Sequence, residues 1–335
     1  MYHPLPARRE AQPTGVIETL SAGFTAVHRQ LWVLLLPALL DLFLWLGPHV
    51  SYSPLVGPVV TDATEWTRQV ALGPRRAPRN RDLVNALDQS RQWLIARSDE
   101  LNGLEAVAWG PIALPSLGTL PSASDELAFV NGWQDGVPLL GASLGLGLLL
   151  GGWFYAGLAA ASTGAGGGPI EASRGTPRAV VDVLGLVAVL IGSALLVGVP
   201  VLLLIGFTAL VSPPIAVLGC VLLLAGVLFA SVHLFFAVAA IFVSRAGPLT
   251  AIQRSVILVR RHLWPSVALI FLTWLILAGM GRVWDMLASN VQPPYGVAVG
   301  ILGNTYIASG LIAAGMIFYF QRSEPMSNSG AVTPG

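Results

Sequence analysis

One aspartate inside an apolar run is the residue of this chain whose chemistry stands out most. Asp41 interrupts the run Leu31–Leu46, within the sequence PALLDLFLWLG. A carboxylate at the centre of a membrane-spanning helix costs about 2.5–3.5 kcal/mol, so it needs a partner or must stay protonated. It therefore serves an ion or proton relay, or it bonds a neighbouring helix or a backbone amide freed by Pro37. A relay normally uses several ionisable groups, which favours the structural role.

A histidine and two polar residues complete the set of intramembrane candidates. His233 lies in the fourth apolar run, about 10 Å from Asp41 in depth at ~1.5 Å per residue, so contact requires offset or tilted helices. A lone histidine there is more often a packing residue than a ligand. Asn304 and Tyr306, in the segment GNTYIASG, either line a polar cavity or hydrogen-bond between helices. The predicted intramembrane polar site is Asp41, His233, Asn304 and Tyr306.

Motifs for catalysis, cofactors and metals are missing from the sequence. It holds no Walker A loop, dinucleotide fingerprint or HExxH, and Cys220 is its only cysteine. We therefore expect no catalytic residue, no cofactor and no metal site, and no enzyme. The net charge of +1 and the lack of a basic face predict no nucleic-acid partner.

These side chains must be positioned by apolar helices. The chain is 54% hydrophobic and 10% charged, against about 25% charged in soluble domains. About 20 apolar residues are needed to cross roughly 30 Å of hydrocarbon. Six runs reach or approach that length: Leu31–Leu46, Pro138–Ala161, Asp182–Val211, Pro214–Val243, His262–Met280 and Val297–Phe320. The prediction is an all-α, polytopic bundle of six spans with the lipid bilayer as its main partner.

Prolines divide the longest apolar block. Residues 182–243 are almost continuously apolar, and the sequence Ser212-Pro213-Pro214 is the best break, because tandem prolines cannot continue a helix. Pro200 is expected to kink the third span.

The distribution of arginine predicts the orientation. All 18 basic residues are arginines, and ten of them lie in the two tails and in the loops after the second and fourth spans. The short loops on the opposite side hold only Arg282, while the long loop His49–Gly136 exceeds about 60 residues and crosses regardless of its charge. The first apolar run begins only at Leu31 and is not followed by the small-x-small cleavage site of a signal peptide. We therefore expect this run to be retained as the first span. Both termini are predicted to be cytoplasmic, in a bacterial plasma (inner) membrane.

Two segments read as amphipathic helices lying on the cytoplasmic surface of the membrane, Val16–Gln30 and Pro248–His262. Their ends match each other, since Val27–Trp32 (VHRQLW) aligns with Val259–Trp264 (VRRHLW). Pro169–Val181 also carries arginine before a span. This pattern indicates three repeated units, each an interfacial segment with two spans. Alternatively, it reflects only the basic and aromatic residues typical of any cytoplasmic interface.

The outer loop is predicted to be partly helical. Leucines at helical spacing indicate a helix over Asp82–Leu101, ended by Asn102-Gly103, and Asp62–Leu72 is a shorter candidate. Irregular chain is expected after Trp109, where glycine and proline are frequent. The predicted divisions are a cytoplasmic tail with an interfacial helix (1–30), the first span (31–48), the extracytoplasmic loop (49–136), a five-span bundle (137–320) and a disordered tail (321–335).

The six-span layout and the paired Val27–Trp32 and Val259–Trp264 segments resemble a group of uncharacterised bacterial membrane domains. The same features are similar to the membrane domain attached to some glycerophosphodiester phosphodiesterases. The catalytic domain of those enzymes has no counterpart here and no catalytic residue can be carried over, so the resemblance implies a membrane fold and does not imply hydrolase activity.

Two functions are favoured by the sequence over a third, a lipid-modifying enzyme, for which no nucleophile–base pair or metal cluster is visible. The first is a non-enzymatic scaffold or accessory subunit whose extracytoplasmic loop binds a protein partner. The alternative is a transporter or channel with Asp41 and His233 in its pathway.

Overall fold

The described part of the chain is dominated by long apolar helices. The computed structural model describes residues 15–69, 81–100, 102–108, 110, 112–117, 127–130, 132–165, 168–291 and 294–328. Within them, five helices are long and apolar enough to cross a membrane: Trp133–Thr163, Pro169–Ala209, Pro213–Ser244, Leu263–Asn290 and Tyr295–Ser323. A sixth is reached if the bent pair Val16–Arg29 and Trp32–Leu46 counts as one span. The fold is an α-helical membrane bundle, as predicted.

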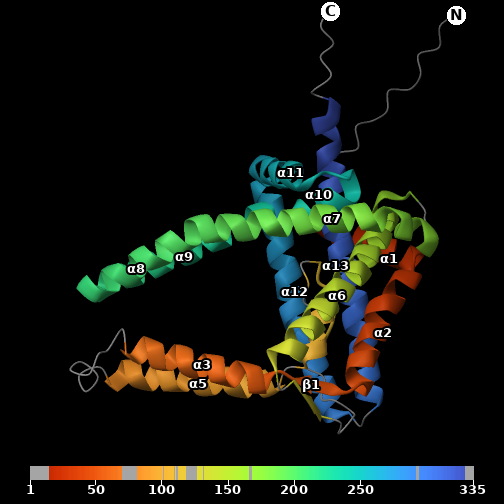
Figure 1. Ribbon diagram of the computed structural model, residues 1–335. Helices are drawn as coiled ribbons and strands as arrows, with labels where there is room; N and C mark the ends of the chain where they lie inside the picture. Colours follow the sequence, from red (N-terminus) through yellow and green to blue (C-terminus); the bar gives the residue numbers. More distant parts are fainter. Residues whose placement is uncertain are drawn as a thin grey trace, which may run out of the picture. The chain divides into compact units, whose positions relative to one another are not determined.

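Figure 1 labels the elements, which divide into two compact units. In chain order they are α1 (Val16–Arg29), α2 (Trp32–Leu46), β1 (His49–Ser51), α3 (Ser53–Thr67), α5 (Arg81–Glu100), the 3₁₀ helix η3 (Gly103–Val107), β2 (Leu127–Phe129), α6 (Trp133–Thr163), α7 (Pro169–Ser193), the π-helical turn η4 (Ala194–Gly198), α8 (Val199–Val211), α9 (Pro213–Leu234), α10 (Ala237–Ser244), α11 (Pro248–Arg261), α12 (Leu263–Asn290) and α13 (Tyr295–Asn328). Unit 1 comprises Met1–Val33, Tyr155–Gly279 and Tyr306–Gly335, and unit 2 comprises Leu34–Phe154 and Met280–Thr305.

In unit 1, three helices begin in the same way. A glycine in extended conformation precedes each of α1, α7 and α11, with φ and ψ of −61° and 169° at Gly15, −78° and 175° at Gly168, and −67° and 167° at Gly247. Each helix then buries the residues four, eight and twelve positions after its glycine: Thr19, Gly23 and Val27; Ala172, Thr176 and Val180; Ala251, Ser255 and Val259. Each of the three helices therefore packs through a stripe of residues at the same three positions, which supports the interpretation as a repeat.

The repeated helices differ at their ends. Helices α1 and α11 each have 14 residues and end at residues with similar backbone angles, −135° and 61° at Gln30 and −128° and 47° at His262. A span begins directly after each, and between α1 and α2 the chain bends by 85°. By contrast, α7 continues through η4 into α8 as one stretch of 41 residues, Pro169–Ala209. At ~1.5 Å per residue this is about twice the thickness of the hydrocarbon core, so only part of it can be a perpendicular span.

Prolines shape the α8–α9 hairpin of unit 1. The turn lies at Ser212, whose extended angles of −149° and 96° precede Pro213, so the break predicted from the tandem prolines is confirmed. Pro200 sits in the first turn of α8, directly after the π-helical turn. A π turn accommodates a residue that cannot donate its backbone hydrogen bond. The side chains of this hairpin are mostly exposed and apolar, which is what contact with lipid requires.

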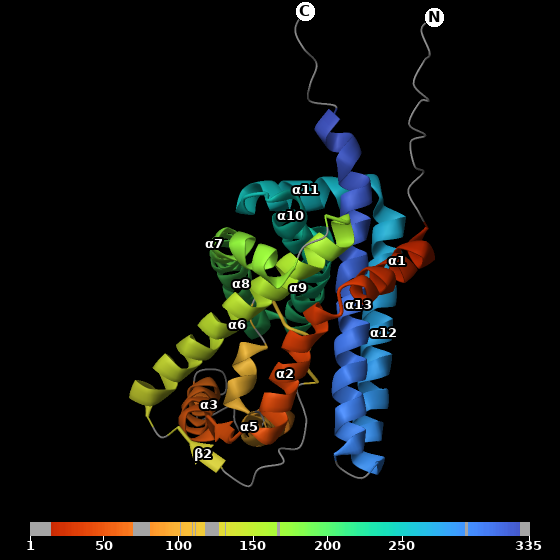
Figure 2. The ribbon, with the colours of Figure 1, turned by 90° about the vertical axis from the view of Figure 1, so that its right-hand side faces the viewer.

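In unit 2, helices α3 and α5 lie side by side (Figures 1 and 2), and a short two-stranded ribbon lies at their base. Strands β1 and β2 pair in parallel, with His49 opposite Leu127 and Ser51 opposite Phe129. Helix α5 begins and ends within one residue of the predicted Asp82–Leu101, whereas α3 starts well before the predicted Asp62.

A non-helical segment of unit 2 is buried against α6. From Asn102 the chain forms η3, and the described residues 110 and 112–117 that follow are irregular, with Val107 and Ile112 buried. A Cβ on Gly147 would overlap the carbonyl oxygen of Val107, and one on Gly151 would lie 2.5 Å from that of Ile112. The irregular chain predicted after Trp109 is present, but it packs inside the unit. Non-helical backbone beside an apolar helix is tolerated where protein covers it.

Helix α13 extends beyond the sixth apolar run. It continues to Asn328, past Phe320 where the run ends. The rest of the predicted disordered tail, residues 329–335, lies outside the described residues.

Candidate functional site

Asp41 is buried and bonded within unit 2. Its side chain is 1% exposed. The hydroxyl of Ser116 donates to Oδ1 at 2.5 Å, and the backbone N–H of Leu117 donates to Oδ2 at 3.3 Å. Both donors belong to the irregular segment, 75 and 76 residues further along the chain. Asp41 thus holds that segment against α2, and its partners are a loop hydroxyl and a loop backbone amide, whereas the sequence offered a neighbouring helix or a backbone amide freed by Pro37.

Glu105 is a second buried carboxyl of unit 2, which sequence reasoning missed. It lies in η3 and is 6% exposed, and its Oε2 has no hydrogen-bond partner among the described residues. Burial raises the pKa of Glu105 to about 7, the backbone N–H of Asn102 and the charge of Arg97 lower it, and the charge of Asp41 raises it further. Two carboxyls therefore lie near each other in this unit.

His233 packs against Phe229 in unit 1. Its Nδ1 lies 2.8 Å from the carbonyl oxygen of Phe229, and the two rings have centroids 4.1 Å apart. The hydroxyl of Ser255 donates to the carbonyl oxygen of His233 at 2.6 Å and accepts from the N–H of Phe236 at 3.2 Å. The helical ladder is interrupted between α9 and α10, and Ser255 satisfies the backbone groups on both sides of that break.

Asn304 and Tyr306 fall in different units. Asn304 is half-buried in unit 2, and its neighbour Thr305 has a buried hydroxyl without a partner among the described residues. Tyr306, in unit 1, packs against Phe24 with ring centroids 5.6 Å apart. No hydrogen bond or ring contact joins two of the four predicted residues inside either unit, so no polar site formed by all four is assembled within one unit.

The α3–α5 hairpin of unit 2 has almost no core of its own. Among its described side chains, only Leu55 is buried. Polar contacts join the two helices: a guanidinium nitrogen of Arg68 lies 2.6 Å from Asp88, and Nε of Arg91 lies 3.3 Å from the hydroxyl of Thr61. Large apolar side chains instead face outward, with exposures of 51% for Val59, 66% for Trp66, 64% for Trp93 and 43% for Leu94. We call these four residues the hairpin surface.

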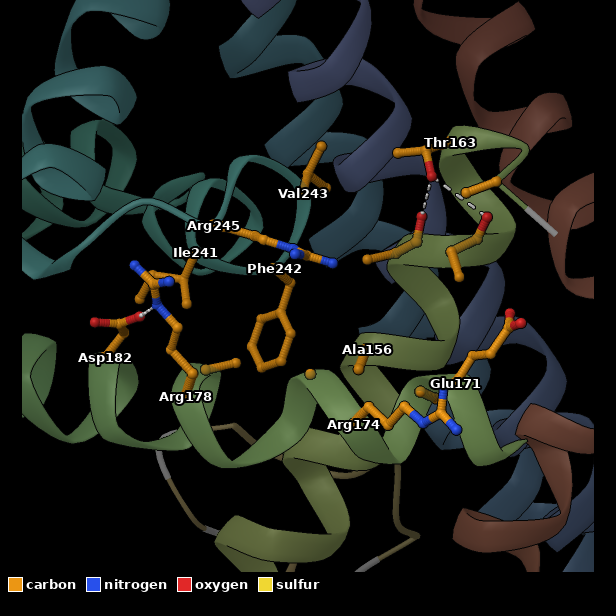
Figure 3. Close-up of a pocket in the computed structure, with 16 residues that line it drawn as sticks. Ala156, Thr163, Glu171, Arg174, Arg178, Asp182, Ile241, Phe242, Val243 and Arg245 are labelled. Atoms are coloured by element: carbon orange, nitrogen blue, oxygen red, sulfur yellow. Dashed lines mark hydrogen bonds and ion pairs between the residues drawn. The ribbon is translucent and has the colours of Figure 1, made fainter. Parts of the chain in front are cut away.

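A cavity of about 600 Å³ opens in unit 1 between the end of α6, the first turns of α7 and the end of α10. Figure 3 shows Arg245 extending from the end of α10 above Phe242, while Arg174 and Arg178 project from α7. Nε of Arg178 lies 3.9 Å from a carboxylate oxygen of Asp182. We call this cavity the arginine pocket.

Arg245 holds an unusual backbone conformation. It caps the C-terminus of α10 with φ of 51° and ψ of 37°. Among the described residues that are not glycine, only Arg245 has a positive φ. The left-handed conformation costs roughly 1–2 kcal/mol for a residue with a Cβ, and glycine is the usual residue at such a cap. The sequence showed the three arginines of the pocket, but it indicated them only as markers of orientation, because their approach depends on how α7 and α10 pack.

The fold and these sites define a multi-pass α-helical membrane protein. Neither a protein-family model, nor a curated protein, nor a solved structure matches the chain.

Proposed function

We propose that this protein is a non-enzymatic scaffold or accessory subunit of a bacterial plasma membrane, and that it binds a protein partner through the α3–α5 hairpin outside the cell membrane. The observation that carries the proposal is the hairpin surface. Among the described side chains of these two helices only Leu55 is fully buried, so the pair removes little apolar area from water and gains little stability by itself. A bound partner supplies the missing burial.

The side chains of the hairpin favour a protein over the lipid surface as that partner. Residues 53–100 hold six carboxylates and seven arginines, so the hairpin lacks the large excess of cations with which amphipathic helices bind an anionic membrane surface. Exposed tryptophan is also the side chain most enriched at the energetic centre of protein interfaces.

The orientation rests on arginine counts. With both termini in the cytoplasm, the three repeated helices of unit 1 and their arginines lie on the cytoplasmic side, and the α3–α5 hairpin lies outside. This arrangement is the one that the positive-inside rule favours.

The test is purification of the tagged protein with its partner from mild detergent. We expect a stoichiometric partner with the wild type, and loss of that partner in Trp66→Ser and Trp93→Ser, because one interface tryptophan is worth about 2 kcal/mol or more, roughly 30-fold in affinity. Trp264→Ser is the matched control, since Trp264 is 80% exposed on α12. Recovery of a lone monomer in several mild detergents would contradict the proposal.

The second candidate is a transporter or channel that uses Asp41 and His233. It gains support from Glu105, because a relay needs more than one ionisable group and this carboxyl lies near Asp41. For this candidate, Asp41→Asn is expected to abolish a pH-dependent flux in liposomes while the amount of folded protein is unchanged, and Glu105→Gln is expected to reduce it. An unaltered flux in Asp41→Asn removes this candidate.

A further inference from the structure

The arginine pocket has the composition of a site for an anionic headgroup. Its rim holds the guanidinium groups of Arg174, Arg178 and Arg245, against the carboxylates of Glu171 and Asp182. Asp182 is engaged by Arg178 at 3.9 Å, and neither Arg174 nor Arg245 forms an ion pair with a described residue. The lining thus carries three cations against two carboxylates, and it has a net positive charge. We propose that the pocket binds a phosphate group, with Arg174 and Arg245 as its principal ligands.

Guanidinium groups suit phosphate for a geometric reason. Each presents parallel N–H donors that match two oxygens of a phosphate, and it stays charged at any physiological pH. The two arginines come from different helices, α7 and the end of α10, and both line the cavity, so a phosphate inside it would be bound by side chains of two elements. Arg178 also lines the cavity, and its contact with Asp182 at 3.9 Å offsets part of its charge.

The walls of the cavity favour an amphiphile as the carrier of that phosphate. Below the charged rim, the pocket is lined by Ala156, Ala160, Ile241 and Phe242. These side chains offer no donor to a free inorganic ion, but they match the glycerol and first methylenes of a phospholipid. Basic pockets between membrane helices are known to hold anionic headgroups on the cytoplasmic side.

The backbone of Arg245 provides an independent argument. Glycine would relieve the strain of the left-handed cap at this position, yet the chain places a long charged side chain there. Strain at a single residue persists where the surroundings or a ligand make use of it. An arginine whose cap conformation aims it over a cavity fits a binding role better than a role in the turn.

The experiment uses the full-length protein in a neutral detergent, with native mass spectrometry and thermal unfolding as the two measurements. The probes are dioleoyl phosphatidylglycerol, dioleoyl phosphatidylcholine and inorganic phosphate. The variants are Arg174→Gln and Arg245→Gly, and Arg260→Gln is the matched control, because Arg260 is exposed on α11 and does not line the pocket.

We expect the anionic lipid to bind at least tenfold more tightly than the zwitterionic lipid, and each pocket variant to lower its affinity by about tenfold. Arg260→Gln should leave it unchanged. Without lipid, Arg245→Gly should unfold at the same or a higher temperature than the wild type, which separates loss of binding from loss of folding.

The source of the phosphate is decided in the same titration. If inorganic phosphate displaces the anionic lipid at millimolar concentration, the site recognises the phosphate itself, and a soluble anion is its ligand. If the lipid resists that competition, the ligand is the phospholipid. Equal binding of the two lipids, or equal losses in Arg260→Gln and the pocket variants, overturns the proposal, because the arginines would then act only as general interfacial cations.

Discussion

At the scale of single residues, Glu105 links stability to pH. Its pKa in the folded protein is about 7, raised by burial above the value of 4.5 for an exposed glutamate. The folded state therefore holds this proton more tightly than the unfolded state. The stabilising contribution is fully present below about pH 4.5 and is lost as the pH rises through 7.

We expect the apparent unfolding temperature to fall between pH 5 and pH 8, and the fall to be smaller in Glu105→Gln. At pH 8 that variant should be more stable than the wild type by about 2 kcal/mol, since the amide has no charge to bury. Thermal unfolding in detergent at several pH values measures this. Asp62→Asn, which changes an exposed carboxyl of α3, should keep the wild-type profile; parallel profiles for Glu105→Gln and the wild type would refute the prediction.

The two buried carboxyls also differ in how visible they are in the sequence. Asp41 stands out because its neighbours are leucines, so the cost of placing it in lipid can be read directly. Glu105 lies among ordinary loop residues and is buried only because η3 packs inside unit 2. The partners of Asp41 were equally hidden, since Ser116 follows it by 75 residues. The residues around a buried carboxylate in the sequence show what its burial costs in free energy. They do not show which distant residue offsets that cost.

At the scale of elements, the close packing of α1 on α13 is set by a glycine. A Cβ at Gly23 would overlap the carbonyl oxygen of Gly310 and lie 2.6 Å from the backbone nitrogen of Ala314. We expect Gly23→Ala to destabilise the protein by about 1–3 kcal/mol, because backbone atoms cannot move aside as a side chain can. Thermal unfolding in detergent gives the measurement.

Gly192→Ala is the control for this prediction. Gly192 lies in α7, and a methyl group on its Cα would meet no other atom within 4 Å, so alanine there should be neutral or stabilise the helix by about 0.5–1 kcal/mol. If both substitutions had the same effect, the contact between α1 and α13 would not depend on Gly23.

Most elements could be predicted from the sequence, because their causes are local. The break at Ser212-Pro213 and the helix ending before Asn102-Gly103 follow from proline and glycine chemistry. The repeat could not be decided from Val27–Trp32 and Val259–Trp264 alone. Its stripe is carried by residues as different as Gly23, Ser255 and Thr176, which share only the position that they occupy against neighbouring helices.

At the scale of the whole molecule, the orientation can be tested with cysteines. In a Cys220→Ala background, Ser90→Cys on α5 should react with a membrane-impermeant maleimide in intact cells, and Thr250→Cys on α11 should react only after permeabilisation. Both positions are exposed, so access to the reagent and not burial decides the outcome. Labelling of Thr250→Cys from outside would reverse the orientation, and labelling of neither would place the hairpin in the cytoplasm.

The hydrogen bond between Asp41 and Ser116 can form only after the ribosome has synthesised both residues. The two residues are 75 positions apart, and a ribosome adds roughly 5–20 residues per second, so the donor emerges about 4–15 s after its acceptor. The first apolar helix must therefore wait at the insertion machinery, or reach the bilayer with its aspartate unsatisfied, until the following stretch has been synthesised and has folded back. A nascent chain stalled before codon 116 should consequently be a poorer substrate for release into lipid than one stalled after it.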